Sequence, residues 1–144
     1  MRRVNINQYL GTINQVLDST QEKSTEMDPY FNIFRSALND HKEVEADDYE
    51  ATEEIFADGI QQYQQNLDKL THATAPVQLI GIHKMLIAHY RDFVEGCVAM
   101  NDSIDFKNHQ VNQEKFDEAE KAQEDAMDKV NRSVQKIIRG LHLR

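Results

Sequence analysis

Residue types that interrupt regular secondary structure or form disulfide cross-links are scarce in this sequence. Its 144 residues include five Gly, two Pro, one Cys and no Trp. So few Gly and Pro leave little material for tight turns and hairpins, and the composition therefore favours helices. The single cysteine, Cys97, has no partner for an internal disulfide, and its apolar neighbours predict a reduced core residue. The length is that of one ordinary domain, so we expect residues 1–144 to form a single helical-bundle domain.

Long apolar runs are missing as well. No stretch approaches the roughly 20 apolar residues that a membrane-spanning helix needs. The first residues, MRRVNINQYLG, contain no apolar run of signal-peptide length. We therefore expect a cytoplasmic protein that does not bind membranes.

Positive charge is in short supply, and the formal net charge is −9. Because phosphate binding needs concentrated Lys and Arg, we expect no nucleic-acid partner. The acidic run EVEADDYEATEE could be a calcium or partner site. It lacks the Asp-x-Asp-x-Asp-Gly spacing of an EF-hand loop, however, which favours a solvated helix face. The segment 39–48 can be either helix or loop.

Apolar residues in the segment 6–38 recur with an alternating four-and-three spacing, as in the helices of a bundle. Pro29 interrupts this segment, and the helix either bends or breaks there; we favour a bend. Similar patterns predict helices near 49–70, 76–105 and 111–141. Long helices joined by short connections must run antiparallel, so the sequence predicts an all-α, up-down-up-down bundle of four long helices.

That topology has a consequence for charge along the axis of the bundle. We expect the acidic segment 40–58 to lie at one end, close to a second acidic group further along the chain. The basic residues near the two termini should lie at the opposite end. The second acidic group comprises Asp102, Asp105, Asp117 and Glu118, and the basic residues are Arg2, Arg3, Arg139 and Arg144.

Recognisable catalytic and cofactor motifs are absent from the sequence. A di-iron bundle of the ferritin type needs a Glu three residues before a His, and no His here has one. One Cys and six scattered His do not supply zinc-binding spacing, and no nucleotide-binding loop or nucleophile elbow is present. We therefore expect no metal and no cofactor. The protein is better interpreted as non-enzymatic, and an enzyme whose site is assembled across helices stays open.

His83 is the titratable residue that stands out, because it lies in the middle of the apolar arc of the third predicted helix. A buried His must find a hydrogen-bond partner. In the antiparallel bundle we expect that partner to be Tyr63 or a backbone carbonyl, which would make His83 a structural residue of the core. The alternative is a small-ligand or metal-binding site centred on His83, with Tyr63 and Tyr90 lining it.

The opposite side of the same helix carries mostly small residues where an exposed face would usually carry long polar ones. These residues are Gly81, Met85, Ala88, Asp92, Ala99 and Ser103. Small side chains let another helix approach closely, so this stripe is a candidate interface. The alternative is an ordinary exposed surface that carries small side chains and binds no partner. The leading functional hypothesis is a non-enzymatic bundle that acts through protein–protein association, as a homo-oligomer or with another protein partner.

Overall fold

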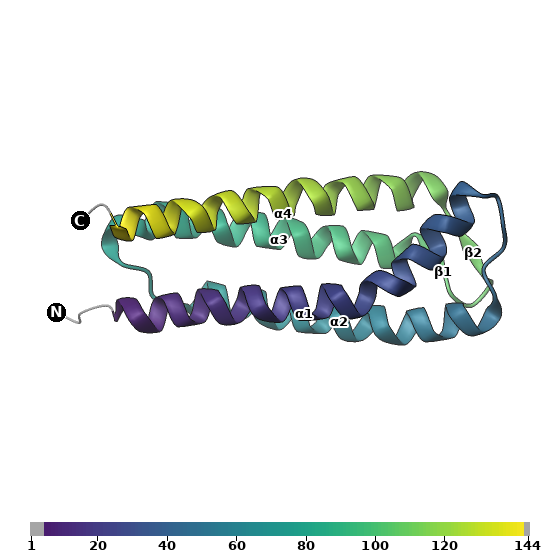
Figure 1. Cartoon of the computed structure of the whole chain (residues 1–144), viewed down its shortest axis with the longest axis horizontal. Helices are drawn as coiled ribbons and strands as arrows, with labels where there is room; N and C mark the ends of the chain where they lie inside the picture. Colours follow the sequence, from purple (N-terminus) through teal and green to yellow (C-terminus); the bar gives the residue numbers. More distant parts are fainter. Residues whose placement is uncertain (1–4, 143–144) are drawn as a thin grey trace.

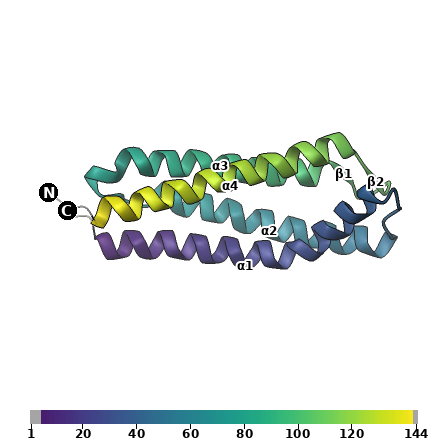
Figure 2. The ribbon, with the colours of Figure 1, turned by 45° about the horizontal axis from the view of Figure 1, so that its top comes forward.

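The computed structural model of the chain describes residues 5–142 and is an all-α bundle. Within these residues it contains four long helices, α1 (Ile6–Asn39), α2 (Ala46–His72), α3 (Ile80–Asp102) and α4 (Gln113–His142). Successive helices run in opposite directions and pack side by side (Figures 1 and 2). The predicted up-down-up-down arrangement is therefore confirmed.

Pro29 bends α1 without breaking it. The helix is continuous from Ile6 to Asn39 with Pro29 inside it, and its second half changes direction (Figure 1). Proline has no N–H to donate and its ring crowds the preceding turn, which accounts for the bend. Beyond the bend, Arg35 forms ion pairs with Asp117 and Glu120 of α4, with both N–O distances 2.8 Å. The bend thus tilts the end of α1 toward the start of α4.

The connections between helices differ in part from the prediction. A short 3-10 helix, η1 (Val77–Leu79), precedes α3. The helix α3 ends at Asp102, and a small antiparallel hairpin follows it. The hairpin consists of β1 (Ile104–Asp105) and β2 (Gln110–Val111). The segment 39–48, for which the sequence allowed either helix or loop, contains the end of α1, a loop over 40–45 and the start of α2. The sequence predicted helix through residue 105, and this detail was wrong.

Buried side chains divide into two clusters along the bundle. The terminal cluster lies toward the chain ends and includes Tyr9, Ile13, Tyr63, Leu70, Leu86, Tyr90, Val130 and Ile137. The carbonyl of Leu70 bonds to His83. The hairpin cluster lies toward β1 and β2 and includes Phe34, Tyr49, Phe56, Met100, Ile104, Phe116 and Ala119. Met27 of α1 packs against both clusters. The bend of α1 is thus close to the boundary between them.

The predicted separation of charge along the bundle concerns residues at its two ends. The loop 40–45 and the β1–β2 hairpin share one end, and the end of α4 lies at the other, beside the start of α1 (Figure 1). The acidic residues of the loop therefore lie far from Arg139 along the axis. Arg2, Arg3 and Arg144 lie outside the described residues. In the part of the chain that the structure describes, no helix is both long and apolar enough to cross a membrane.

Candidate functional site

His83 uses both ring nitrogens inside the core. Its Nε2 lies 2.8 Å from the carbonyl oxygen of Leu70, and its Nδ1 lies 2.9 Å from the hydroxyl of Tyr9. A carbonyl only accepts, so Nε2 donates to Leu70 and Nδ1 accepts from Tyr9 in the neutral ring. Burial lowers the pKa of His83, which favours that neutral form. The prediction named Tyr63 or a backbone carbonyl as the partner, and the structure has the carbonyl of Leu70, with Tyr9 as a second partner that was not predicted.

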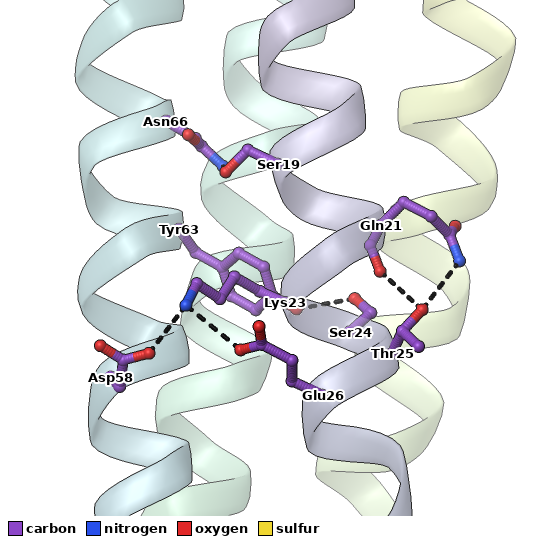
Figure 3. A network of polar contacts seen from close by, with 9 residues as sticks. All are labelled: Ser19, Gln21, Lys23, Ser24, Thr25, Glu26, Asp58, Tyr63 and Asn66. Atoms are coloured by element: carbon purple, nitrogen blue, oxygen red, sulfur yellow. Dashed lines mark hydrogen bonds and ion pairs between the residues drawn. The ribbon is translucent and has the colours of Figure 1, made fainter.

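Tyr63 and Tyr90 are occupied by other polar groups. The Tyr63 hydroxyl lies 2.7 Å from the Ser24 hydroxyl, in the space between α2 and α1 (Figure 3). The Tyr90 hydroxyl lies 2.7 Å from that of Thr20 and accepts from the Asn66 amide at 3.2 Å. Burial raises the pKa of both tyrosines, so they remain protonated. The three residues of the predicted ligand site therefore belong to three separate hydrogen-bonded pairs or networks.

These networks tie α1 to its neighbours. Asn66 of α2 also donates to the Ser19 hydroxyl at 3.2 Å, and Lys23 contacts Asp58 at 2.9 Å on the outside of the same helix pair (Figure 3). Asn66 is fully buried, so its amide would be costly to leave unpaired. The polar groups at this level fix how α1 and α2 are aligned.

A cavity of about 180 Å³ lies away from His83, at the level where α1 bends. All four long helices contribute to its wall. The side chains lining it are Ser24, Met27, Asp28, Phe31, Phe56, Tyr63, Phe93, Cys97, Met100, Glu120, Gln123 and Glu124. Tyr63 is the one residue of the predicted ligand set among them. Sequence reasoning missed this cavity, because its walls come from positions that each look like ordinary core or surface.

Cys97 lies in the wall of this cavity as a protonated thiol. Burial raises the pKa of Cys97 to about 12, and its Sγ donates to the Gln123 side chain at 3.5 Å. Nucleophilic and metal-binding cysteines need the thiolate, which this environment disfavours. Within residues 5–142, moreover, no group of three or more His, Cys, Asp or Glu side chains is arranged to hold a metal ion.

The outer face of α3 is exposed over most of the predicted stripe. Gly81, Met85, Ala88, Asp92 and Ala99 are exposed. Ser103 is not: its side chain is buried and donates to the Met100 carbonyl at 2.6 Å. Ser103 caps the end of α3, and its carbonyl accepts from the Asn112 N–H at 2.8 Å, so the hairpin adjoins Ser103 where a longer helix would have left it exposed.

Exposed large apolar residues also lie in η1 and in the first turns of α3. Val77 is 81% exposed, Met85 47% and Ile80 42%. Together with Gly81 and Ala88 they form what we call the α3 patch. Large apolar side chains gathered at a surface are a common feature of protein–protein contacts.

Comparisons with protein-family models, with curated proteins and with solved structures find no match for this chain. A function for the protein therefore has to follow from its own residues.

Proposed function

We propose that the protein acts by non-enzymatic association with a second copy of itself, through the α3 patch. The observation that carries this proposal is the exposure of Val77, Ile80 and Met85 in the same stretch of chain as the exposed small residues Gly81 and Ala88. Burying these side chains releases ordered water, and the small residues let a second helix come close.

The arrangement of the face suits a pair of copies related by a two-fold axis. If two α3 helices cross antiparallel at Ala88, η1 of one copy, which carries Val77, lies toward the end of the other copy's α3 that carries Ala99. An exposed apolar side chain of one copy then lies near a small one of the other at two symmetric places. Such large-to-small pairing is what close helix packing requires.

Sedimentation of the full chain tests this proposal. The unmodified protein should sediment as a dimer, and Ala88→Arg should weaken dimerisation by at least about tenfold, because a long charged side chain at the crossing point separates the helices. Circular dichroism should stay helical, since Ala88 is exposed in the single chain. Ala57→Arg, the same change at an exposed position of α2, is the matched control and should leave the dimer intact. A monomer at high concentration would refute the proposal.

A further inference from the structure

The cavity at the bend of α1 has an apolar, aromatic interior. Phe31, Phe56 and Phe93 line it together with Met27 and Met100. Its volume of about 180 Å³ is close to that of engineered cavities of about 150 Å³ that bind benzene. A compact apolar group of that size therefore fits between the terminal and hairpin clusters.

The polar atoms inside the cavity already have partners. The hydroxyls of Tyr63 and Ser24 bond to each other. The Gln123 amide donates to the Gly96 carbonyl at 3.2 Å and its oxygen accepts from Cys97. A ligand therefore does not need hydrogen-bonding groups of its own to fill the interior.

Acidic residues line the same cavity where it meets solvent. Asp28 and Glu124 are exposed, and Glu120 is partly exposed and paired with Arg35. Among the described residues neither Asp28 nor Glu124 forms an ion pair, and no Lys or Arg belongs to the cavity wall. The opening is negative and the interior is apolar.

We propose that this cavity binds a small organic cation, an ammonium group attached to a compact apolar body. The body packs among Phe31, Phe56 and Phe93, whose ring faces also attract positive charge. The ammonium group lies at the opening, near Asp28 and Glu124. An anion would be repelled there, and a neutral molecule of the same shape would gain only the apolar part of the binding energy. The site is separate from the α3 patch, so it does not depend on dimerisation.

Calorimetry of the full chain with two probes of the same shape tests the charge requirement. The cation 2-phenylethylammonium should bind more tightly than the neutral 2-phenylethanol. The double variant Asp28→Asn, Glu124→Gln should weaken cation binding about fivefold, as expected for two exposed carboxylates, and should leave binding of the alcohol unchanged.

The matched control removes the same two charges elsewhere on the protein. Glu118 and Asp125 are exposed on α4 and do not line the cavity. The double variant Glu118→Gln, Asp125→Asn should bind the cation as the unmodified protein does. Equal weakening in the control, equal affinity of the two probes, or no binding of the cation would each overturn the proposal.

A second variant tests the location. Cys97→Leu places a larger side chain in the cavity wall and should abolish binding of both probes. Its thermal midpoint should not fall, because the added carbons enter open space. A folded Cys97→Leu protein that binds the cation with unchanged affinity would show that the ligand lies elsewhere. If Cys97→Leu does not fold, the charge variants still decide.

Discussion

Aromatic rings pack against one another in both clusters, but in the terminal cluster buried polar side chains also bond to one another across helices. Tyr9 with His83, and Thr20 with Tyr90, form such bonds. In the hairpin cluster, Phe31 stacks on Phe116 with ring centroids 5.4 Å apart.

Unpaired polar atoms follow the same division. The hydroxyl of Thr52 and the amide oxygen of Asn101 are buried without a hydrogen-bond partner among the described residues, and Thr52 precedes Phe56 of the hairpin cluster by one helical turn. Paired polar groups define one alignment of the helices, since any other alignment leaves them unsatisfied. Aromatic packing stabilises in proportion to the apolar area that it buries, and it tolerates small shifts of one helix against another. The terminal cluster therefore specifies the alignment, and the hairpin cluster contributes mainly apolar burial.

The largest expected effect comes from truncating an aromatic ring of the hairpin cluster. Phe116 is fully buried, stacks on Phe31 and lies beneath the Arg35 guanidinium at 4.9 Å. Phe116→Ala should lower the free energy of unfolding by about 3–5 kcal/mol in urea titrations, because it opens a cavity and removes apolar burial. Phe106→Ala, the same change at a half-buried residue of this cluster, should cost much less. Equal costs would mean that Phe116 is not central to the cluster.

A pair of polar-to-apolar changes tests the difference between the clusters directly. Asn66→Leu removes the partner of the Tyr90 and Ser19 hydroxyls and should destabilise the protein by about 1–3 kcal/mol. Thr52→Val replaces a buried hydroxyl that has no partner, so it should be neutral or slightly stabilising. Chemical denaturation of both variants gives the two values. The proposed division of roles is wrong if Thr52→Val costs as much as Asn66→Leu.

A smaller effect should appear in the pH dependence of stability. Burial lowers the pKa of His83 in the folded chain, while the unfolded chain binds a proton near the ordinary value of about 6.5. Protons then favour the unfolded state, so the free energy of unfolding should fall as pH drops below about 6.5 and stop falling below the folded pKa.

His83→Gln should remove this part of the pH dependence, because Gln does not titrate. The same substitution at the exposed His72 is the control and should leave it in place. Denaturant titrations between neutral and mildly acidic pH measure both variants. A slope that His83→Gln leaves unchanged would assign the dependence to other groups.

Several features could be predicted because they depend only on nearby residues. The burial of His83 followed from its place on the apolar arc, at the helical rotation of 100° per residue. Bending at Pro29 followed from the missing N–H. The exposure of Ala88 and Ala99 followed from the same rotation. Tyr9 could also have been found, since it lies one helical turn before the buried Ile13.

The sequence indicates the hairpin after α3 less clearly than it indicates the helices. Asp105 accepts from the Asn108 backbone N–H at 3.0 Å, and Asn112 accepts from that of Lys115 at 3.1 Å at the start of α4. Asp and Asn at these positions are typical of turns and helix caps. Helical spacing alone carried the third predicted helix past them, and Ser103 was placed on the outer face for that reason.

The helices, their order and the faces that they bury follow from the residues of each segment, because helical rotation and chain connectivity are local properties. The pairing of His83 with Tyr9 and of Tyr63 with Ser24 follows only from the packing of the helices. Those pairings depend on how far each helix slides and turns against its neighbours. The cavity has the same origin, since it lies where a bent α1 meets three other helices. A bend can be read from one proline, but the space beside it depends on all the side chains that pack around it.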